Sequence, residues 1–139
     1  LMKYDEVDDQ FFKISIICNE DEGLAISREL ETKVGHIVEI VRSGTDSIDL
    51  GIHGINKATG IKYLQEHLNI NPDEIMAFGD SENDLEMLKY VQYSFAMDNG
   101  FDSVKKVAKY IAPSNDENGV LEVIDHLLDE DGDFSKYIK

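Results

Sequence analysis

The sequence has few basic residues, and this shortage excludes whole classes of partner. Lys and Arg number 13 against 29 Asp and Glu, which gives a formal net charge of −16 and an isoelectric point near 4.4. A chain of this charge repels nucleic-acid backbones and anionic bilayers at long range, so we expect neither as a partner. Dissolved cations, by contrast, are attracted.

Cysteine and long apolar runs are also scarce. The lone Cys18 cannot form a disulfide within the chain, which fits a reducing compartment, and its apolar neighbours favour a small buried side chain without chemistry. No apolar stretch approaches the roughly 18 residues that span a bilayer, and the acidic residues 1–10 are unlike a signal peptide. We therefore expect a cytoplasmic protein, and a hydrophobic share of 42% predicts a packed core.

Residues 11–53 show the pattern of a small α/β unit. The run 11–18, rich in aromatic and β-branched residues, predicts a strand, and apolar spacing over 23–33 predicts a helix. Two extended runs, 36–42 and 47–53, are joined by polar and glycine residues and predict a β-hairpin.

From residue 54 the pattern alternates between helix and strand, which is typical of a parallel sheet covered by helices. Gly51 and Gly54 bracket a hinge, so we expect two domains, 1–53 and 54–139. The run 75–78 is wholly apolar, as in strands buried on both faces. The remaining expected strands are 93–97 and 110–112, and the expected helices are 59–68, 82–90, 101–109 and 120–128.

The segment from Phe78 to Asp84 carries the clearest candidate chemistry. The apolar strand delivers Asp80 to its carboxyl end, where open parallel sheets bind ligands, and Asp84 in the next helical turn can face the same point. Two converging carboxylates suit Mg²⁺. The spacing fits equally well a turn residue at Asp80 and a helix N-terminal acid at Asp84. An EF-hand is excluded, because Leu85 stands where that loop needs glycine.

The order Gly-Asp-x-x-Asn-Asp, then Leu-x-Met-Leu, resembles the fourth motif of the haloacid dehalogenase (HAD) superfamily, in its Cof-type sugar-phosphate phosphatase subclass. The segment 54–57 is similar to the third motif, and 96–99 and 113–120 follow the remaining pattern in order. The resemblance covers residues 11–127. It departs at Gly100, where alanine is common, and at 58–60, where glycine more often follows the lysine directly.

This resemblance implies a Rossmann-like α/β core and a Mg²⁺-dependent phosphatase for a small phosphorylated metabolite. Asp80 would ligate the metal directly, while Asp84 with Asn83 would hold metal-bound water or orient neighbouring groups, and Asn83 would also contact substrate. Lys57 would act as the catalytic and substrate-binding ammonium beside the phosphate, because phosphoryl transfer needs positioning and positive charge. Without the resemblance, we would interpret Lys57 as an exposed lysine at the hinge.

The nucleophile of that family, the first aspartate of Asp-x-Asp-Gly-Thr, has no counterpart in this sequence. Residues 1–53 would then match the last part of an α/β cap and residues 54–139 the second half of the catalytic core. Without an aspartyl-phosphate we expect this chain alone to be inactive, and its uncovered sheet edge predicts a homo-oligomer or pairing with a missing N-terminal half. The alternative is a non-catalytic acidic α/β module that binds metal or a protein partner.

Overall fold

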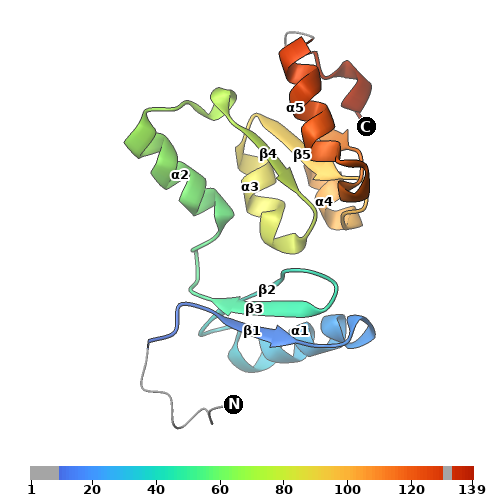
Figure 1. Ribbon diagram of the computed structural model, residues 1–139. Helices are drawn as coiled ribbons and strands as arrows, with labels where there is room; N and C mark the ends of the chain where they lie inside the picture. Colours follow the sequence, from blue (N-terminus) through green and yellow to red (C-terminus); the bar gives the residue numbers. More distant parts are fainter. Residues whose placement is uncertain (1–9, 130–132) are drawn as a thin grey trace. The chain divides into compact units, whose positions relative to one another are not determined.

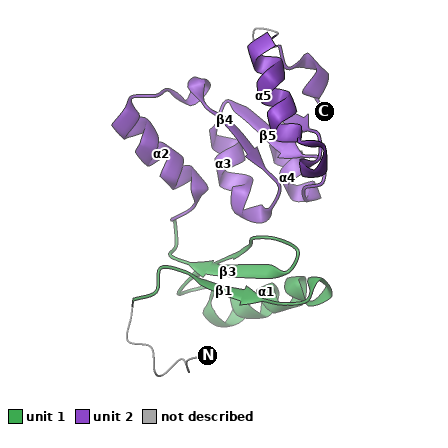
Figure 2. Cartoon of the chain, in the orientation of Figure 1, with its two compact units in different colours: residues 1–54 green, residues 55–139 purple. Residues whose placement is uncertain are grey.

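The computed structural model describes residues 10–129 and 133–139, and the chain forms two compact units, Leu1–Gly54 and Ile55–Lys139 (Figure 2). The boundary between them follows Gly54, close to the hinge expected from the glycine residues. Among the described helices, none is both long and apolar enough to cross a membrane.

The first unit is a three-stranded antiparallel sheet with one helix on one face (Figure 1). Strand β3 lies between β2, its partner in the predicted hairpin, and β1, which pairs Ser15 with Asp49. Because side chains alternate along a strand, Ile48 points into the core under α1 and is fully buried, while Asp49 lies on the opposite face. The elements are β1 (Ile14–Ile17), α1 (Glu20–Val34), β2 (Glu39–Arg42) and β3 (Ser47–Gly51).

The second unit confirms the predicted α/β architecture, a parallel sheet in the order β4-β5-β6 with helices on both faces. One local difference concerns the expected helix 82–90, which begins as the 3-10 turn Glu82–Asp84 before α3. The strands are β4 (Met76–Gly79), β5 (Tyr93–Met97) and β6 (Tyr110–Ala112), and the helices are α2 (Lys57–Leu68), α3 (Leu85–Tyr90), α4 (Asp102–Val107) and α5 (Gly119–Asp129).

Two apolar clusters fill the two faces of this parallel sheet. Under α3 and α4 lie small and branched side chains, and under α5 lies an aromatic cluster that includes the C-terminal Phe134 and Tyr137. Sequence reasoning did not identify these two aromatic residues as core, because an acidic run precedes them. The first cluster consists of Ala77, Leu88, Val91, Ala96, Val104 and Ala108, and the second of Phe95, Met97, Ala112, Val123, Phe134 and Tyr137.

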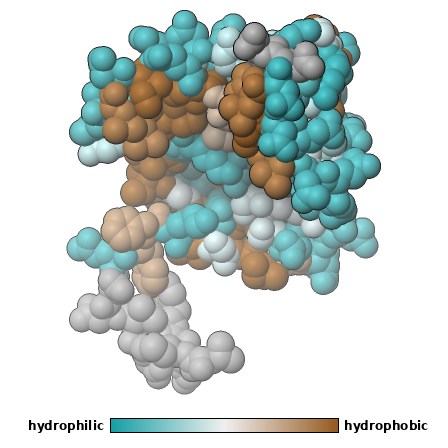
Figure 3. Space-filling view, turned by 45° about the horizontal axis from the view of Figure 1, so that its top comes forward, coloured by the Kyte–Doolittle hydropathy of each residue, from teal (hydrophilic) through white to brown (hydrophobic). Residues whose placement is uncertain are grey.

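Apolar side chains also remain exposed on the second unit. On α2, Tyr63, Leu64 and Leu68 are all more than half exposed, and Leu121 and Leu128 on α5 are 59% and 75% exposed. Figure 3 shows apolar side chains gathered in patches on the surface rather than scattered singly.

Candidate functional site

Asp84 is the central residue of the candidate site, because its buried carboxylate gathers the donors around it. The carboxylate is 4% exposed, and its Oδ2 accepts hydrogen bonds from the backbone amides of Asp80 (2.9 Å) and Ser81 (3.2 Å). Its Oδ1 accepts a hydrogen bond from the ammonium of Lys57. A buried carboxylate with three donors is well satisfied, so it holds the loop after β4 in one conformation.

The local sequence explains why Asp84 takes this position. Ser81 precedes the turn and Asp84 is its third residue, the spacing of a capping box, in which each side chain satisfies the other's backbone. Gly79 leaves the space that the carboxylate occupies, because a Cβ at this position would lie 2.5 Å from the Asp84 Cβ and 2.9 Å from Oδ2. The glycine at the end of β4 is therefore required by close packing.

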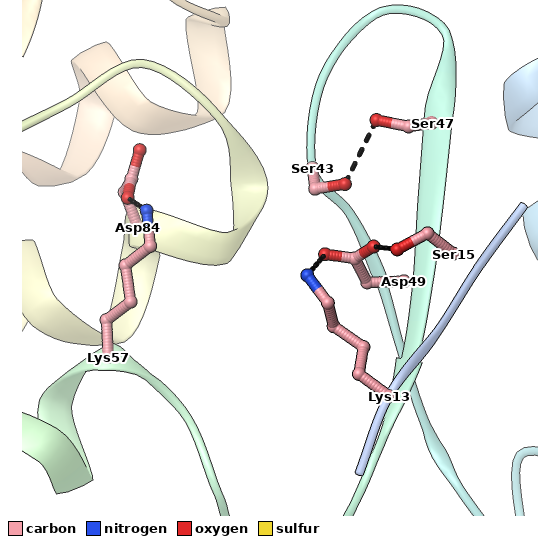
Figure 4. Close-up of polar contacts among 7 residues, drawn as sticks. All are labelled: Lys13, Ser15, Ser43, Ser47, Asp49, Lys57 and Asp84. Carbon is pink, nitrogen blue, oxygen red and sulfur yellow. Dashed lines mark hydrogen bonds and ion pairs between the residues drawn. The ribbon is translucent and has the colours of Figure 1, made fainter. Parts of the chain in front are cut away.

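Lys57 reaches the site from the first residue of α2, and Figure 4 shows its side chain extended to Asp84. Asn56 caps this helix by accepting a hydrogen bond from the Thr59 amide (3.1 Å). Further along, α2 packs on α3 through Gln65, whose Oε1 accepts from the Tyr90 hydroxyl (2.5 Å). The Lys57 side chain remains 48% exposed, so its ammonium is both held by Asp84 and accessible from solvent.

Asp80 has a fixed backbone and an exposed side chain. Its carbonyl accepts a hydrogen bond from the Phe101 amide (2.8 Å), and Gly100 packs so closely that a Cβ there would lie 2.9 Å from the Asp80 Cα. Among the described residues, none donates to the Asp80 carboxylate. This carboxylate stands at the carboxyl end of β4 with its oxygens open to a ligand.

Asn83 has the one buried side-chain polar atom in the described part of the chain that lacks a hydrogen-bond partner, its Oδ1. Buried amide oxygens in proteins are nearly always paired, so an unpaired one indicates a donor that is supplied from outside. Water, a hydrated ion or a ligand could supply it. Its position between Asp80 and Asp84 places this acceptor in the same loop as the open carboxylate.

The neighbouring strand ends carry further polar groups. Asn99 follows β5, and its Oδ1 accepts a hydrogen bond from the backbone amide of Asn115 after β6 (3.1 Å). This bond connects the loops that follow the two strands. Asp98 forms an ion pair with Lys105 at 3.5 Å. These contacts place polar groups at the carboxyl ends of β5 and β6. The sequence does not show the bond between Asn99 and Asn115, because the two residues follow different strands.

Asp80 and Asn83 supply oxygen atoms suited to part of the coordination shell of Mg²⁺. Mg²⁺ binds through one or two carboxylates and keeps several waters or substrate oxygens. Asp80 offers an open carboxylate and Asn83 an unpaired oxygen, whereas both oxygens of Asp84 already accept donors from the protein. Among the described residues, no group of three or more His, Cys, Asp or Glu side chains could hold a metal alone. The residues present fit a hydrated ion that takes its other ligands from water or from substrate.

Comparison with known proteins shows the family and the fold of the chain. Residues 2–124 match the family of haloacid dehalogenase-like hydrolases. The chain is 38% identical over 133 residues to the 5-amino-6-(5-phospho-D-ribitylamino)uracil phosphatase YbjI of Escherichia coli (strain K12), covering 96% of this chain and 49% of YbjI. A second relative, the phosphatase YitU of Bacillus subtilis (strain 168) named for the same compound, is 38% identical over 85 residues, which are 61% of this chain and 28% of YitU.

Solved structures show the same fold over the same span. SMU.1108c from Streptococcus mutans UA159 superposes with a TM-score of 0.82 at 37% identity, over 92% of this chain and 48% of that protein. The HAD subclass IIB sugar phosphatase BT4131 superposes with a TM-score of 0.73 at 27% identity, over 86% of this chain and 44% of BT4131. The chain thus spans about half the length of these relatives or less. With the predicted motifs in order and the fold confirmed, the chain belongs to the haloacid dehalogenase-like hydrolases.

Proposed function

We propose that this chain is the metal- and phosphate-binding part of a Mg²⁺-dependent phosphatase that hydrolyses a small phosphorylated metabolite. The observation that supports the proposal is the Lys57 ammonium, held by buried Asp84 in the loop that presents the open Asp80 carboxylate. Phosphoryl transfer requires a metal ligand and a fixed cation close together, and here the Lys57 ammonium on α2 is held by the loop that carries Asp80.

Asp80 is the proposed direct ligand, because its carboxylate is exposed and has no donor among the described residues. Asn83 would accept a hydrogen bond from metal-bound water or from substrate through its unpaired Oδ1. Asp84 would act on the metal through water, because its oxygens already hold Lys57 and two amides. When bound, Mg²⁺ supplies positive charge to the transferring phosphoryl oxygens.

Lys57 would neutralise a phosphate oxygen as negative charge develops there. Its partner Asp84 is 4% exposed and already accepts the ammonium in the absence of substrate, so the charge is held before substrate arrives. A pre-positioned charge spends no binding energy on reorganisation when the substrate reacts. The Lys57–Asp84 pair therefore supports a catalytic role over that of a free hinge lysine.

The nucleophile of the proposed reaction would come from polypeptide outside this sequence, which contains no Asp-x-Asp-Gly-Thr segment. The first unit would be the last part of a cap domain and the second unit the second half of the catalytic core. The apolar strand β4 is an edge strand of the described sheet, and edge strands of this kind need a covering partner. That partner would be the missing half or a second copy of the chain.

The relatives guide the choice of substrate. YbjI and YitU are named as phosphatases of 5-amino-6-(5-phospho-D-ribitylamino)uracil, a phosphate ester of a hydroxylated carbon chain. We propose that the complete protein acts on phosphate esters of this general kind in the cytoplasm. A screen of phosphorylated metabolites would begin with this compound and with sugar phosphates.

The test compares this chain with a longer protein that contains it and an upstream Asp-x-Asp-Gly-Thr segment. The longer protein should hydrolyse p-nitrophenyl phosphate with Mg²⁺, and Asp80→Asn should lower kcat/KM roughly 100-fold or more because the open ligand is lost. Asp125→Asn, on the exposed side of α5, is the control and should leave the rate unchanged.

The chain alone allows a second test that does not depend on turnover. Paramagnetic Mn²⁺ should broaden the amide NMR signals of residues 80–83, and Asp80→Asn should abolish the broadening. Turnover by the 139-residue chain, or unchanged activity of Asp80→Asn, would refute the proposal. Metal binding without turnover in the longer protein would favour the non-catalytic module instead.

A further inference from the structure

Helix α2 is joined to the α3 segment by one polar contact near each of its ends. At the N-terminal end, Lys57 donates to Asp84, which directly precedes α3. About two turns later, Gln65 accepts a hydrogen bond from the hydroxyl of Tyr90, the last residue of α3 (2.5 Å). The two helices are neighbours in Figure 1, and α2 packs more extensively on α3 than on any other element. We call the second contact the Gln65–Tyr90 bond.

The amide side chain of Gln65 is buried, although most side chains of α2 are not. It is 8% exposed, whereas the preceding Leu64 and Tyr63 are 53% and 61% exposed. Both ends of the amide are paired, because Oε1 accepts from Tyr90 and Nε2 donates to the Ile70 carbonyl at 3.3 Å. A buried amide costs free energy unless it finds such partners. The helix is therefore held in the rotation about its axis that turns Gln65 toward Tyr90.

Tyr90 contacts α2 through both its hydroxyl and its ring. The hydroxyl donates to Gln65, and the ammonium of Lys62, also on α2, lies 4.8 Å from the ring centroid, within the range of a cation–π contact. The ring also packs against the apolar cluster under α3. The two contributions can be separated by experiment, because Tyr90→Phe removes the hydrogen bond and keeps the ring.

Few other side chains fix the position of α2. Ala58 and Gln65 are its buried residues, and Ile61 between them packs on the apolar cluster under α3, so these three share one face of the helix. The hydrogen-bonded backbone makes this 12-residue helix a nearly rigid rod. If the contact at its C-terminal end is loosened, the rod can tilt about Ala58 and Ile61, and the end that carries Lys57 moves with it.

We propose that Tyr90 is a positioning residue for Lys57. Its hydrogen bond to Gln65 fixes α2 and thereby keeps the Lys57 ammonium on the Asp84 carboxylate. The Lys57 side chain is long and 48% exposed, so its ammonium stays on Asp84 only while the backbone of α2 is held at the right distance. Tyr90 acts through α2 from the other end of α3. The use of this positioning in catalysis rests on the proposed function, whereas the positioning itself does not.

The test measures hydrogen exchange of the Lys57 ammonium by NMR in the isotope-labelled 139-residue chain, with the signal assigned by its absence from Lys57→Met. Tyr90→Phe should raise the exchange rate with water about tenfold, the effect of losing one hydrogen bond. It should also shift the amide signals of Asp80 and Ser81, which donate to Asp84. Tyr63→Phe removes a hydroxyl from an exposed position of α2 and should leave the exchange rate unchanged.

Gln65→Met is an independent variant that removes the same bond from the α2 side and keeps the length of the side chain. It should raise the exchange rate of the Lys57 ammonium at least as much as Tyr90→Phe does. The double variant should exchange no faster than Gln65→Met alone, because both substitutions remove one and the same contact. Additive increases, or an unchanged rate in Tyr90→Phe, would overturn the inference.

The longer protein tests whether this positioning serves the reaction. Tyr90→Phe should lower kcat for p-nitrophenyl phosphate about threefold with little change in KM, because a displaced ammonium stabilises the transition state less. Absence of phosphatase activity in the longer protein would refute the proposed function, and the exchange rate in the 139-residue chain would still decide whether Tyr90 positions Lys57. Equal exchange rates in Tyr90→Phe and the natural chain would overturn this inference and leave the proposed function standing.

Discussion

Two lysine–aspartate pairs, one in each unit, are held in different ways (Figure 4). Asp84 in the second unit accepts two backbone amides besides Lys57, whereas Asp49 in the first accepts the side chains of Ser15 and Lys13. Backbone amides move only when the loop moves, but serine and lysine side chains rotate. The second unit therefore fixes a cation in place, whereas the first offers an adaptable polar surface.

The two units also differ in the number of apolar side chains that their cores bury. Among the described hydrophobic residues of the first unit, Ile48 alone is buried, whereas the second unit buries a cluster on each face of its sheet. Stability follows the apolar area removed from water, so the second unit should be the more stable. Its rigidity suits a site that must hold charges in place.

The largest expected effect comes from Ile48→Ala. Removing this side chain leaves a cavity under α1 and should cost about 3 kcal/mol, enough to unfold the first unit selectively. Amide hydrogen exchange should become fast in β1–β3 and stay slow in β5. The exposed Ile37→Ala is the control and should change little. Equal loss of protection in both units would show that the two cores unfold together.

Asp84→Ala should destabilise the second unit by about 2–3 kcal/mol, because two loop amides lose their acceptor and Lys57 loses its partner. Urea unfolding measures the loss. Glu86→Ala removes one partner of the exposed Lys89–Glu86 pair, 2.6 Å apart, and should cost less than about 1 kcal/mol. If the two variants were equally stable, the carboxylate of Asp84 would not organise the loop.

Gly79→Ala should cost about 1–3 kcal/mol, because the added methyl overlaps the Asp84 side chain. Gly60→Ala is a matched control within α2, where a Cβ meets nothing within 4 Å, and should stabilise the chain by about 0.5–1 kcal/mol. The two substitutions are chemically identical and should shift the thermal midpoint in opposite directions. A midpoint raised by both would contradict the packing at the end of β4.

The smallest effect is the pH dependence at Asp49. The pKa of its carboxyl lies below the ordinary value of 3.8, so its contribution is complete above that value and is lost as the pH falls through the lower, native pKa. The stability difference between the natural chain and Asp49→Asn, below about 1 kcal/mol, should be constant from pH 5 to 8 and shrink in more acidic solution. Urea unfolding across this range measures the difference, and a difference that grew in acid would contradict the assignment.

Sequence reasoning predicted most of the elements because their signals are local. The alternation of helix and strand after residue 54 and the hairpin of 36–53 are confirmed, and strands 93–97 and 110–112 match β5 and β6. The pairing of β1 with β3 and the burial of Phe134 and Tyr137 were not predicted, because both depend on residues far apart in the sequence. The capping spacing of Ser81 and Asp84 was a local signal that could have been used.

The family, the α/β architecture and the loop that carries Asp80, Asn83 and Asp84 could be predicted from the sequence, because they follow from motif order and from apolar periodicity along the chain. The three-dimensional structure was needed to show that Asp84 holds Lys57, that the Asp80 carboxylate stays open, and that Asn83 keeps an unpaired oxygen. The physical reason is that hydrogen bonds and close packing between separate elements select one partner for each carboxylate, and spacing in the sequence does not specify that choice.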